Sequence, residues 1–175
     1  MGAEDLDELA GPNYRKLQGP LLTEPIRSLR LGPAISVPLS ATLQQAVDVM
    51  QTQHLGCVLV VDEGGVLQGI FTERDLLVRV AGRKLDWTRI EISEFMTANP
   101  ESLQSGDGIA WALNLMHIGG YRHVPLVDDA GHPTGVVSVK DIVDFIVDLV
   151  PDEVLNLPPD PRQKPGSADV GGGAD

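Results

Sequence analysis

The sequence predicts an α+β fold made of two βαββα units that pack together through their sheets and are related by a pseudo-two-fold axis. The first observation behind this prediction is an internal repeat, because residues 36–80 align with residues 102–146 at a constant offset of 66 positions without a gap. The second is that each copy carries a stretch with helical periodicity, two short β-rich runs and another helical stretch. The third is that only 4% of the residues are aromatic, so the core must consist of Val, Leu, Ile and Ala, which suit sheets covered by short helices.

Each copy opens on a short extended piece, at 34–37 and at 101–103, and continues into a helix. Within the helix, apolar residues occur at positions 43, 46, 47 and 50, and again at 109, 112, 113 and 116, which is the spacing of one buried helix face. Ser40 or Thr42 is the expected N-cap of the first helix, and Asp107 is that of the second.

A β-hairpin is predicted after the helix in each copy. The apolar runs Val58–Val61 and Val124–Val127 indicate buried strands, and the turns that follow are rich in the Asp and Gly that tight hairpin turns require. The returning strands are predicted at 66–71 and 133–137. A second helix then begins near Thr72 in the first copy and near Ser138 in the second.

The domain organisation follows from the size of the repeat. A single unit of about 55 residues buries too little surface to be stable alone, so we expect the two copies to share a core. The repeats are predicted at 28–80 and 96–150, with a linker at 81–95. Residues 1–27 and 151–175 are predicted to be tails, the second mostly disordered. Residues 151–157 are expected to fold back on the core, because Val154, Leu155 and Leu157 are apolar.

The net charge, the single cysteine and the apolar stretches limit the partners and the location that the sequence predicts. The formal net charge of −12, with both ends of the chain acidic, disfavours nucleic acid as a partner. The single cysteine, Cys57, lies in an apolar run and is predicted to be a buried small hydrophobe without a disulfide partner. We see no secretory signal and no apolar stretch of membrane-spanning length, so the sequence predicts a cytoplasmic location without a membrane partner.

The same motif begins the second helix of both copies: a glycine, two apolar residues, Thr or Ser, two further residues and Asp, at Gly69–Asp75 and Gly135–Asp141. Free amides and a hydroxyl at a helix start attract an anion, and a carboxylate one turn further on can accept the hydroxyls of a ribose. Thr/Ser-x-x-Asp is equally a capping-box pattern that only satisfies the orphan amides of the helix. The motif alone leaves both interpretations open.

Taken together, the repeat, these motifs and the Phe95-Met96-Thr97 opening of the second copy resemble a pair of cystathionine β-synthase (CBS) domains, also called a Bateman module. The resemblance covers residues 28–148 and implies two βαββα units packed through their sheets. It also implies two clefts between the units for adenosine-containing ligands, and frequent disc-like homodimers.

The resemblance also implies candidate ligand-binding residues. Asp75 and Asp141 would hold ribose hydroxyls, each cleft pairing one Asp with the opening strand of the other copy, and basic residues before the strand at 124–127 would hold phosphate. The complete set is Thr72, Asp75, Thr97, Arg122 and His123 around one cleft, and Ile35, Val37, Ser138 and Asp141 around the other. Because Gly56 and Cys57 occupy the positions that correspond to Arg122 and His123, we expect the two clefts to differ.

The function predicted on this basis is a non-catalytic regulatory module that binds AMP, ADP or ATP, with S-adenosylmethionine and NAD less favoured, and signals by changed packing. The alternative is a protein-interaction scaffold without a small-molecule ligand. No nucleophile or acid–base set and no metal-ligand spacing is apparent among the four histidines and one cysteine, so neither an enzyme nor a metal site is predicted. The apolar helix faces at 43–50 and 109–116, with Trp111 as a large anchor, predict a homodimer.

Overall fold

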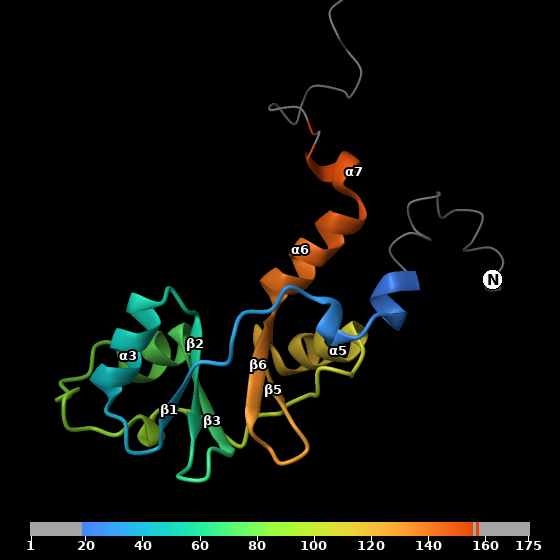
Figure 1. Ribbon diagram of the computed structural model, residues 1–175. Helices are drawn as coiled ribbons and strands as arrows, with labels where there is room; N and C mark the ends of the chain where they lie inside the picture. Colours follow the sequence, from blue (N-terminus) through green and yellow to red (C-terminus); the bar gives the residue numbers. More distant parts are fainter. Residues whose placement is uncertain (1–18, 156, 158–175) are drawn as a thin grey trace, which may run out of the picture.

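The computed structural model describes residues 19–155 and residue 157, and these form two α/β units that lie side by side (Figure 1). The first unit contains β1 (Ser36–Pro38), α3 (Leu43–Thr52), β2 (Cys57–Val61) and β3 (Leu67–Thr72). The second contains α5 (Ile109–Gly119), β5 (His123–Val127), β6 (Pro133–Ser138) and α6 (Val139–Leu149). The predicted α+β class and the two repeated units are confirmed.

The two sheets repeat the same pattern. In the first, β1 runs parallel to β2, and β2 pairs antiparallel with β3 through the predicted tight turn. A fourth strand, β4 (Thr97–Ala98), pairs antiparallel with β3, although it comes from the opening of the second copy. In the second sheet, β5 and β6 form the antiparallel hairpin, and Leu103 forms a parallel bridge to Leu126 at the place that β1 occupies in the first sheet.

The first helix of each copy is capped differently. Thr42 caps α3 in a full capping box, since its hydroxyl accepts from the Gln45 amide and the Gln45 side chain accepts from the Thr42 amide. The prediction that Asp107 caps the second helix is wrong, because the N-cap of α5 is Gly108. Asp107 lies one residue too early, and its carboxylate accepts from the Gln104 amide at 2.7 Å in the preceding turn.

The second helix of each copy differs in length. In the first copy, the three-residue α4 (Glu73–Asp75) continues as a short π-helix, η2 (Leu76–Val80). In the second copy, α6 has eleven residues and is followed by α7 (Pro151–Leu155). Figure 1 shows α6 and α7 extending away from the two sheets.

The two units exchange short segments: the segment before the first copy packs into the second unit, and the segment before the second copy packs into the first. The 3-10 helix η1 (Ile26–Ser28) packs into the core of the second unit, and η3 (Ile92–Glu94) packs into the core of the first. Their contacts are equivalent, because the Ile26 amide donates to the Asp107 carbonyl at 2.8 Å and the Ile92 amide donates to the Ala41 carbonyl at 2.9 Å. Ile26 and Ile92 are both fully buried.

This exchange corrects the predicted boundaries. Part of the predicted tail (1–27) is core, since Ile26 is buried, and part of the predicted linker (81–95) is core, since Ile92 and Phe95 are buried. The repeat therefore extends further towards the N-terminus than the predicted start at residue 28, and the offset of 66 residues still relates Ile26 to Ile92.

The units meet through a small apolar cluster. Cys57, Leu59 and Ile70 of the first sheet form it, with Ala34 and Val136 packed against it. The two hairpin turns also join, because the Leu67 amide donates to the Gly131 carbonyl at 3.0 Å. The predicted packing through the sheets is thus present.

The segment after α6 does not pack as expected. Leu155 is 71% exposed, and Val154 and Leu157 are also exposed, so the prediction that 151–157 folds back on the core is wrong. The remaining tail predictions, for 1–18, 156 and 158–175, concern positions outside the described residues. Among the helices of the described part of the chain, none combines the length and the apolar character needed to cross a membrane.

Candidate functional site

A cavity of about 490 Å³ lies between the two units. The first copy contributes the start of its second helix, and the second copy contributes its opening segment and the approach to β5. The lining residues are Gly56, Ile70, Thr72, Glu73, Arg74, Asp75, Arg79, Thr97, Asn99, Pro100, Glu101, Gly119, Gly120, Tyr121, Arg122, His123 and Pro125. We call this cavity the first cleft.

Asp75 is the most constrained polar group of the first cleft. It is 8% exposed, and one of its carboxylate oxygens, Oδ2, accepts from the Thr72 amide at 3.0 Å and from the Thr72 hydroxyl at 2.7 Å. The Thr72 hydroxyl accepts in turn from the Asp75 amide at 3.2 Å. The capping box proposed from the sequence is therefore formed, and it fixes the carboxylate at the cleft wall.

Arg79, one helical turn after Asp75, binds the other carboxylate oxygen. Its Nε lies 3.2 Å from Asp75 Oδ1. Its Nη1 donates to the carbonyl oxygens of Phe95 and Met96, both at 2.8 Å. Arg79 therefore connects the second helix of the first copy to the segment that leads into β4.

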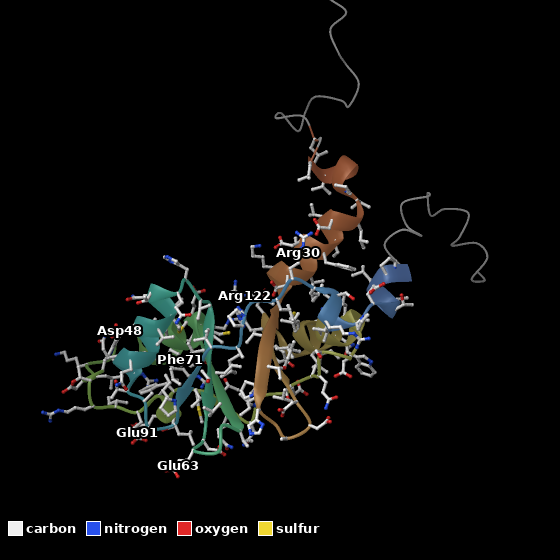
Figure 2. The ribbon with its side chains drawn as sticks, in the orientation of Figure 1. Arg30, Asp48, Glu63, Phe71, Glu91 and Arg122 are labelled. Atoms are coloured by element: carbon white, nitrogen blue, oxygen red, sulfur yellow. The ribbon has the colours of Figure 1, made fainter. Side chains whose placement is uncertain are left out.

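Further basic groups line the same cleft. Arg74 donates to the Gly120 carbonyl at 2.7 Å, across the boundary between the units. Arg122 is exposed and lies between the two units (Figure 2). His123 is half-buried, and burial, followed by the charge of Arg122, lowers its pKa below the ordinary value. The three arginines of this wall balance Glu73, Asp75 and Glu101, so an anion can be accommodated beside the carboxylates.

Tyr121 and Glu101 close one side of the first cleft. The Tyr121 hydroxyl donates to Glu101 Oε2 at 2.5 Å. Burial and the adjacent carboxylate raise the pKa of Tyr121 to about 12, so the hydroxyl keeps its proton at neutral pH. The pair holds the opening segment of the second copy against the approach to β5.

A second cavity, of about 430 Å³, lies beside α6 and has a different character. Its lining residues are Ser28, Leu29, Arg30, Asp141, Asp144, Phe145, Val147 and Asp148. The Ser138–Asp141 capping box reproduces that of Thr72–Asp75, with the Asp141 carboxylate accepting from the Ser138 amide at 2.7 Å and from its hydroxyl at 2.6 Å. Of its three aspartates, Asp148 lies 3.5 Å from Arg30, which is seen beside α6 in Figure 2, and Asp144 is paired with Lys140. We call this cavity the second cleft.

Two matches to one family account for most of the described chain. The sequence profile of the CBS domain matches residues 26–82 and 92–148. The chain belongs to the CBS-domain family. The matched ranges include η1 and η3, so the family unit contains the exchanged segments.

The relatives of this CBS pair include proteins of very different length. A CBS domain-containing protein of Arabidopsis thaliana is 30% identical over 125 residues, which are 71% of this chain and 22% of the relative. The chain thus spans about a fifth of that plant protein. Among solved structures, a CBS-domain-containing protein from Agrobacterium tumefaciens is 31% identical with a TM-score of 0.59, covering 65% of this chain and 90% of that one. A CBS domain protein from Pyrobaculum aerophilum, complexed with AMP, is 22% identical with a TM-score of 0.64, covering 71% and 97%.

The structure brings five of the nine predicted ligand-binding residues together at the first cleft of the CBS pair. They are Thr72, Asp75, Thr97, Arg122 and His123. Asp141 lines the second cleft, where Ser138 holds it but does not itself line the cavity. Ile35 and Val37 do not reach the second cleft, because Val37 points into the core of the first unit and Ile35 packs against the same core. Residues 28–30 line this cavity instead, although at the offset of 66 they correspond to 94–96, which do not line the first cleft.

Several residues of the first cleft were absent from the sequence-based site. Arg74 and Arg79 belong to a basic stretch at 74–89 that fits either a solvated helix face or a patch facing phosphate or a partner, and Tyr121 carries no motif. A further signal was the spacing of four residues between Asp75 and Arg79, which suits an ion pair on a helix.

The glycine of the repeated motif has a packing role. A Cβ at Gly69 would clash with the Sδ atom of Met96, so the glycine leaves room for the segment leading into β4. At Gly135 the nearest atoms are more than 3.5 Å away, one of them the Gly32 carbonyl oxygen.

Cys57 is buried in the contact between the units, as predicted. Burial, aided by the charge of Glu73, raises the pKa of its thiol to about 12, so it is not a reactive thiolate. Across residues 19–155, no three His, Cys, Asp or Glu side chains are grouped as a metal site would require.

Proposed function

We propose that this CBS pair is a non-catalytic regulatory module that binds an adenine nucleotide in the first cleft. The observation that carries the proposal is the placement of the fixed Asp75 carboxylate and the exposed Arg122 guanidinium on the walls of one cavity. A carboxylate accepts ribose hydroxyls, and a guanidinium binds phosphate, so the two groups match the two polar parts of a nucleotide.

The remaining walls suit the base. Ile70, Pro100 and Pro125 give an apolar lining between the polar groups. A volume of about 490 Å³ lies within the range of small-molecule sites. AMP is the first ligand to test, because the protein from Pyrobaculum aerophilum, which shares this fold, is complexed with AMP. ADP and ATP present the same groups, whereas S-adenosylmethionine has no phosphate for Arg122 to bind.

The second cleft is proposed to exclude phosphate. Asp141, Asp144 and Asp148 line it, and its neighbouring cations are already engaged, Arg30 beside Asp148 and Lys140 with Asp144, so none is placed to receive a phosphate. A phosphate placed there would face like charges, which disfavours binding at short range. We therefore expect one nucleotide per chain.

Signalling is proposed to act through packing, within a cytoplasmic homodimer. Trp111 is 64% exposed and Ile118 is 75% exposed, and they lie seven residues apart, on one stripe of α5. An apolar stripe of this kind favours association with a second copy. Because both units contribute to the first cleft, a bound nucleotide can alter how they meet and so change the surface offered to the second copy or to a regulated partner.

Isothermal titration calorimetry with AMP and adenosine tests the proposal. In the wild-type protein, Arg122 should favour AMP over adenosine by about 10- to 150-fold, the range of a charge-assisted hydrogen bond. Arg122→Ala should remove most of this preference, whereas Asp75→Ala should weaken both ligands alike. Arg83→Ala is the matched control, because Arg83 is exposed and does not line the first cleft.

The second candidate function is a protein-interaction scaffold. It is favoured by the capping boxes, which already give Asp75 and Asp141 a structural role, and by the exposed apolar stripe on α5. Failure of AMP, ADP and ATP to bind the wild-type protein, in a sample that circular dichroism shows to be folded, would select the scaffold.

A further inference from the structure

The hydrogen bonds of Asp75 limit what it can still accept. A carboxylate offers about four lone-pair positions, two on each oxygen. Oδ2 already accepts from the Thr72 amide and the Thr72 hydroxyl, at 3.0 and 2.7 Å. A ligand hydroxyl that binds Asp75 must therefore donate its hydrogen bond to the other oxygen, Oδ1.

Oδ1 is itself shared with Arg79, whose Nε lies 3.2 Å away. The guanidinium is anchored at its far end, because Nη1 donates to the Phe95 and Met96 carbonyls and Nη2 lies 3.4 Å from the Thr97 hydroxyl. Its planar fork has its donors in fixed relative positions, so one orientation serves all these acceptors. Displacing it from Oδ1 would disturb the contacts to the segment that leads into β4.

The second copy has no equivalent of this arrangement. Phe145 stands 66 positions after Arg79, so the repeat provides no cation one turn after Asp141. Within the described part of the chain, the hydrogen bonds to the Asp141 carboxylate come from Ser138 alone. Arg79 is therefore specific to the first cleft and is not part of the repeated motif.

We propose that Arg79 is a positioning residue that sets the hydroxyl specificity of the first cleft: with Arg79 on Oδ1, Asp75 accepts one ribose hydroxyl and not two. This inference rests on the proposed nucleotide site and specifies how that site recognises ribose. It predicts a ligand preference that a purely structural ion pair would not produce.

The test is calorimetry with AMP, 2′-deoxy-AMP and 3′-deoxy-AMP. In the wild-type protein, one deoxy analogue should bind within about two-fold of AMP, and the other should bind about 10-fold or more weakly, as expected for the loss of one hydrogen bond to a charged group. In Arg79→Met and Arg79→Gln, Oδ1 gains a free position, so both analogues should bind more weakly than AMP. Arg83→Met is the control and should keep the wild-type pattern.

The outcomes separate the two proposals. A wild-type protein that binds AMP but loses affinity equally with either analogue overturns the role of Arg79 and leaves the nucleotide site standing. A folded Arg79→Met or Arg79→Gln protein that keeps the one-hydroxyl pattern also overturns it. A wild-type protein that binds none of the three ligands contradicts the proposed function, and the role of Arg79 in ribose recognition falls with it.

Discussion

The two clefts of this CBS pair share a motif and differ in almost everything around it. Both have an Asp one turn into the second helix, held by the hydroxyl and amide of the cap residue, with nearly the same hydrogen-bond lengths. The first cleft has three arginines and three carboxylates among its lining residues, whereas the second has one arginine and three carboxylates. The repeated positions thus build the helix start, and the positions that differ between the copies set the charge of each cleft.

The offset of 66 residues shows where the copies diverge. Arg79 corresponds to Phe145, Arg122 to Gly56, and Glu101 to Ile35. A Cβ at Gly56 would lie 3.0 Å from His123 Nε2, so a side chain at this position would compete with the histidine for space. The absence of a side chain at Gly56 therefore leaves space for His123 of the second copy in the first cleft.

The largest expected effect concerns the exchanged segments. Ile26→Ala and Ile92→Ala each remove a fully buried side chain from the core of the opposite unit, so each should lower the free energy of unfolding by about 2–5 kcal/mol. Urea denaturation followed by circular dichroism measures both. A loss below about 0.5 kcal/mol for Ile26→Ala, the size of a surface substitution, would mean that the segment around Ile26 is a tail after all.

A smaller effect should separate the two motif glycines. Gly69→Ala introduces a methyl group that clashes with the Met96 side chain and should cost about 1–3 kcal/mol of unfolding free energy through overpacking. Gly135→Ala, whose Cβ would meet its nearest atom at 3.6 Å, serves as the matched control and should cost less than about 1 kcal/mol. Equal losses in the two variants would show that the glycines act through the backbone and not through the approach of Met96.

The smallest expected effect is a pH dependence of folding stability that arises from His123 in the first cleft. Burial and Arg122 lower the pKa of His123 from its ordinary value of 6.5, so the folded protein binds this proton more weakly than the unfolded chain. The contribution of His123 to stability is therefore fully present above pH 6.5 and is lost as the pH falls towards the lowered pKa. Denaturation at pH 7.5 and pH 5.5 should show a smaller loss in His123→Gln than in the wild-type protein, with exposed His117→Gln as the control. An unchanged loss in His123→Gln would contradict the assignment.

Local patterns in the sequence were sufficient to predict the repeated elements. The apolar runs before the Asp-Gly turns predicted β2 and β5, and Thr72 and Ser138 were placed correctly at helix starts. These features depend on neighbouring residues, whose propensities and capping contacts are encoded nearby.

Long-range contacts could not be predicted in this way. An offset of 66 residues states that Ile26 and Ile92 are equivalent, but it does not state which unit each one joins. Val37 was expected at a cleft, but side chains alternate between the two faces of β1, and that of Val37 points into the core. A shift of one residue in the strand register would place it on the opposite face. Arg79 was missed because the Phe95 and Met96 carbonyls that bind it come from another part of the chain.

The most direct test of the difference between the clefts is AMP binding by Asp75→Ala and Asp141→Ala, measured by calorimetry on the full chain. Both substitutions remove the same half of a capping box, and Asp75→Ala also removes the ion pair with Arg79, so circular dichroism and urea denaturation are used to check that each variant is folded. We predict one AMP per chain in the wild-type protein, a loss of about 10-fold or more in Asp75→Ala, and a change within about two-fold in Asp141→Ala. Two AMP molecules per chain, or a loss in Asp141→Ala as large as that in Asp75→Ala, would contradict the account.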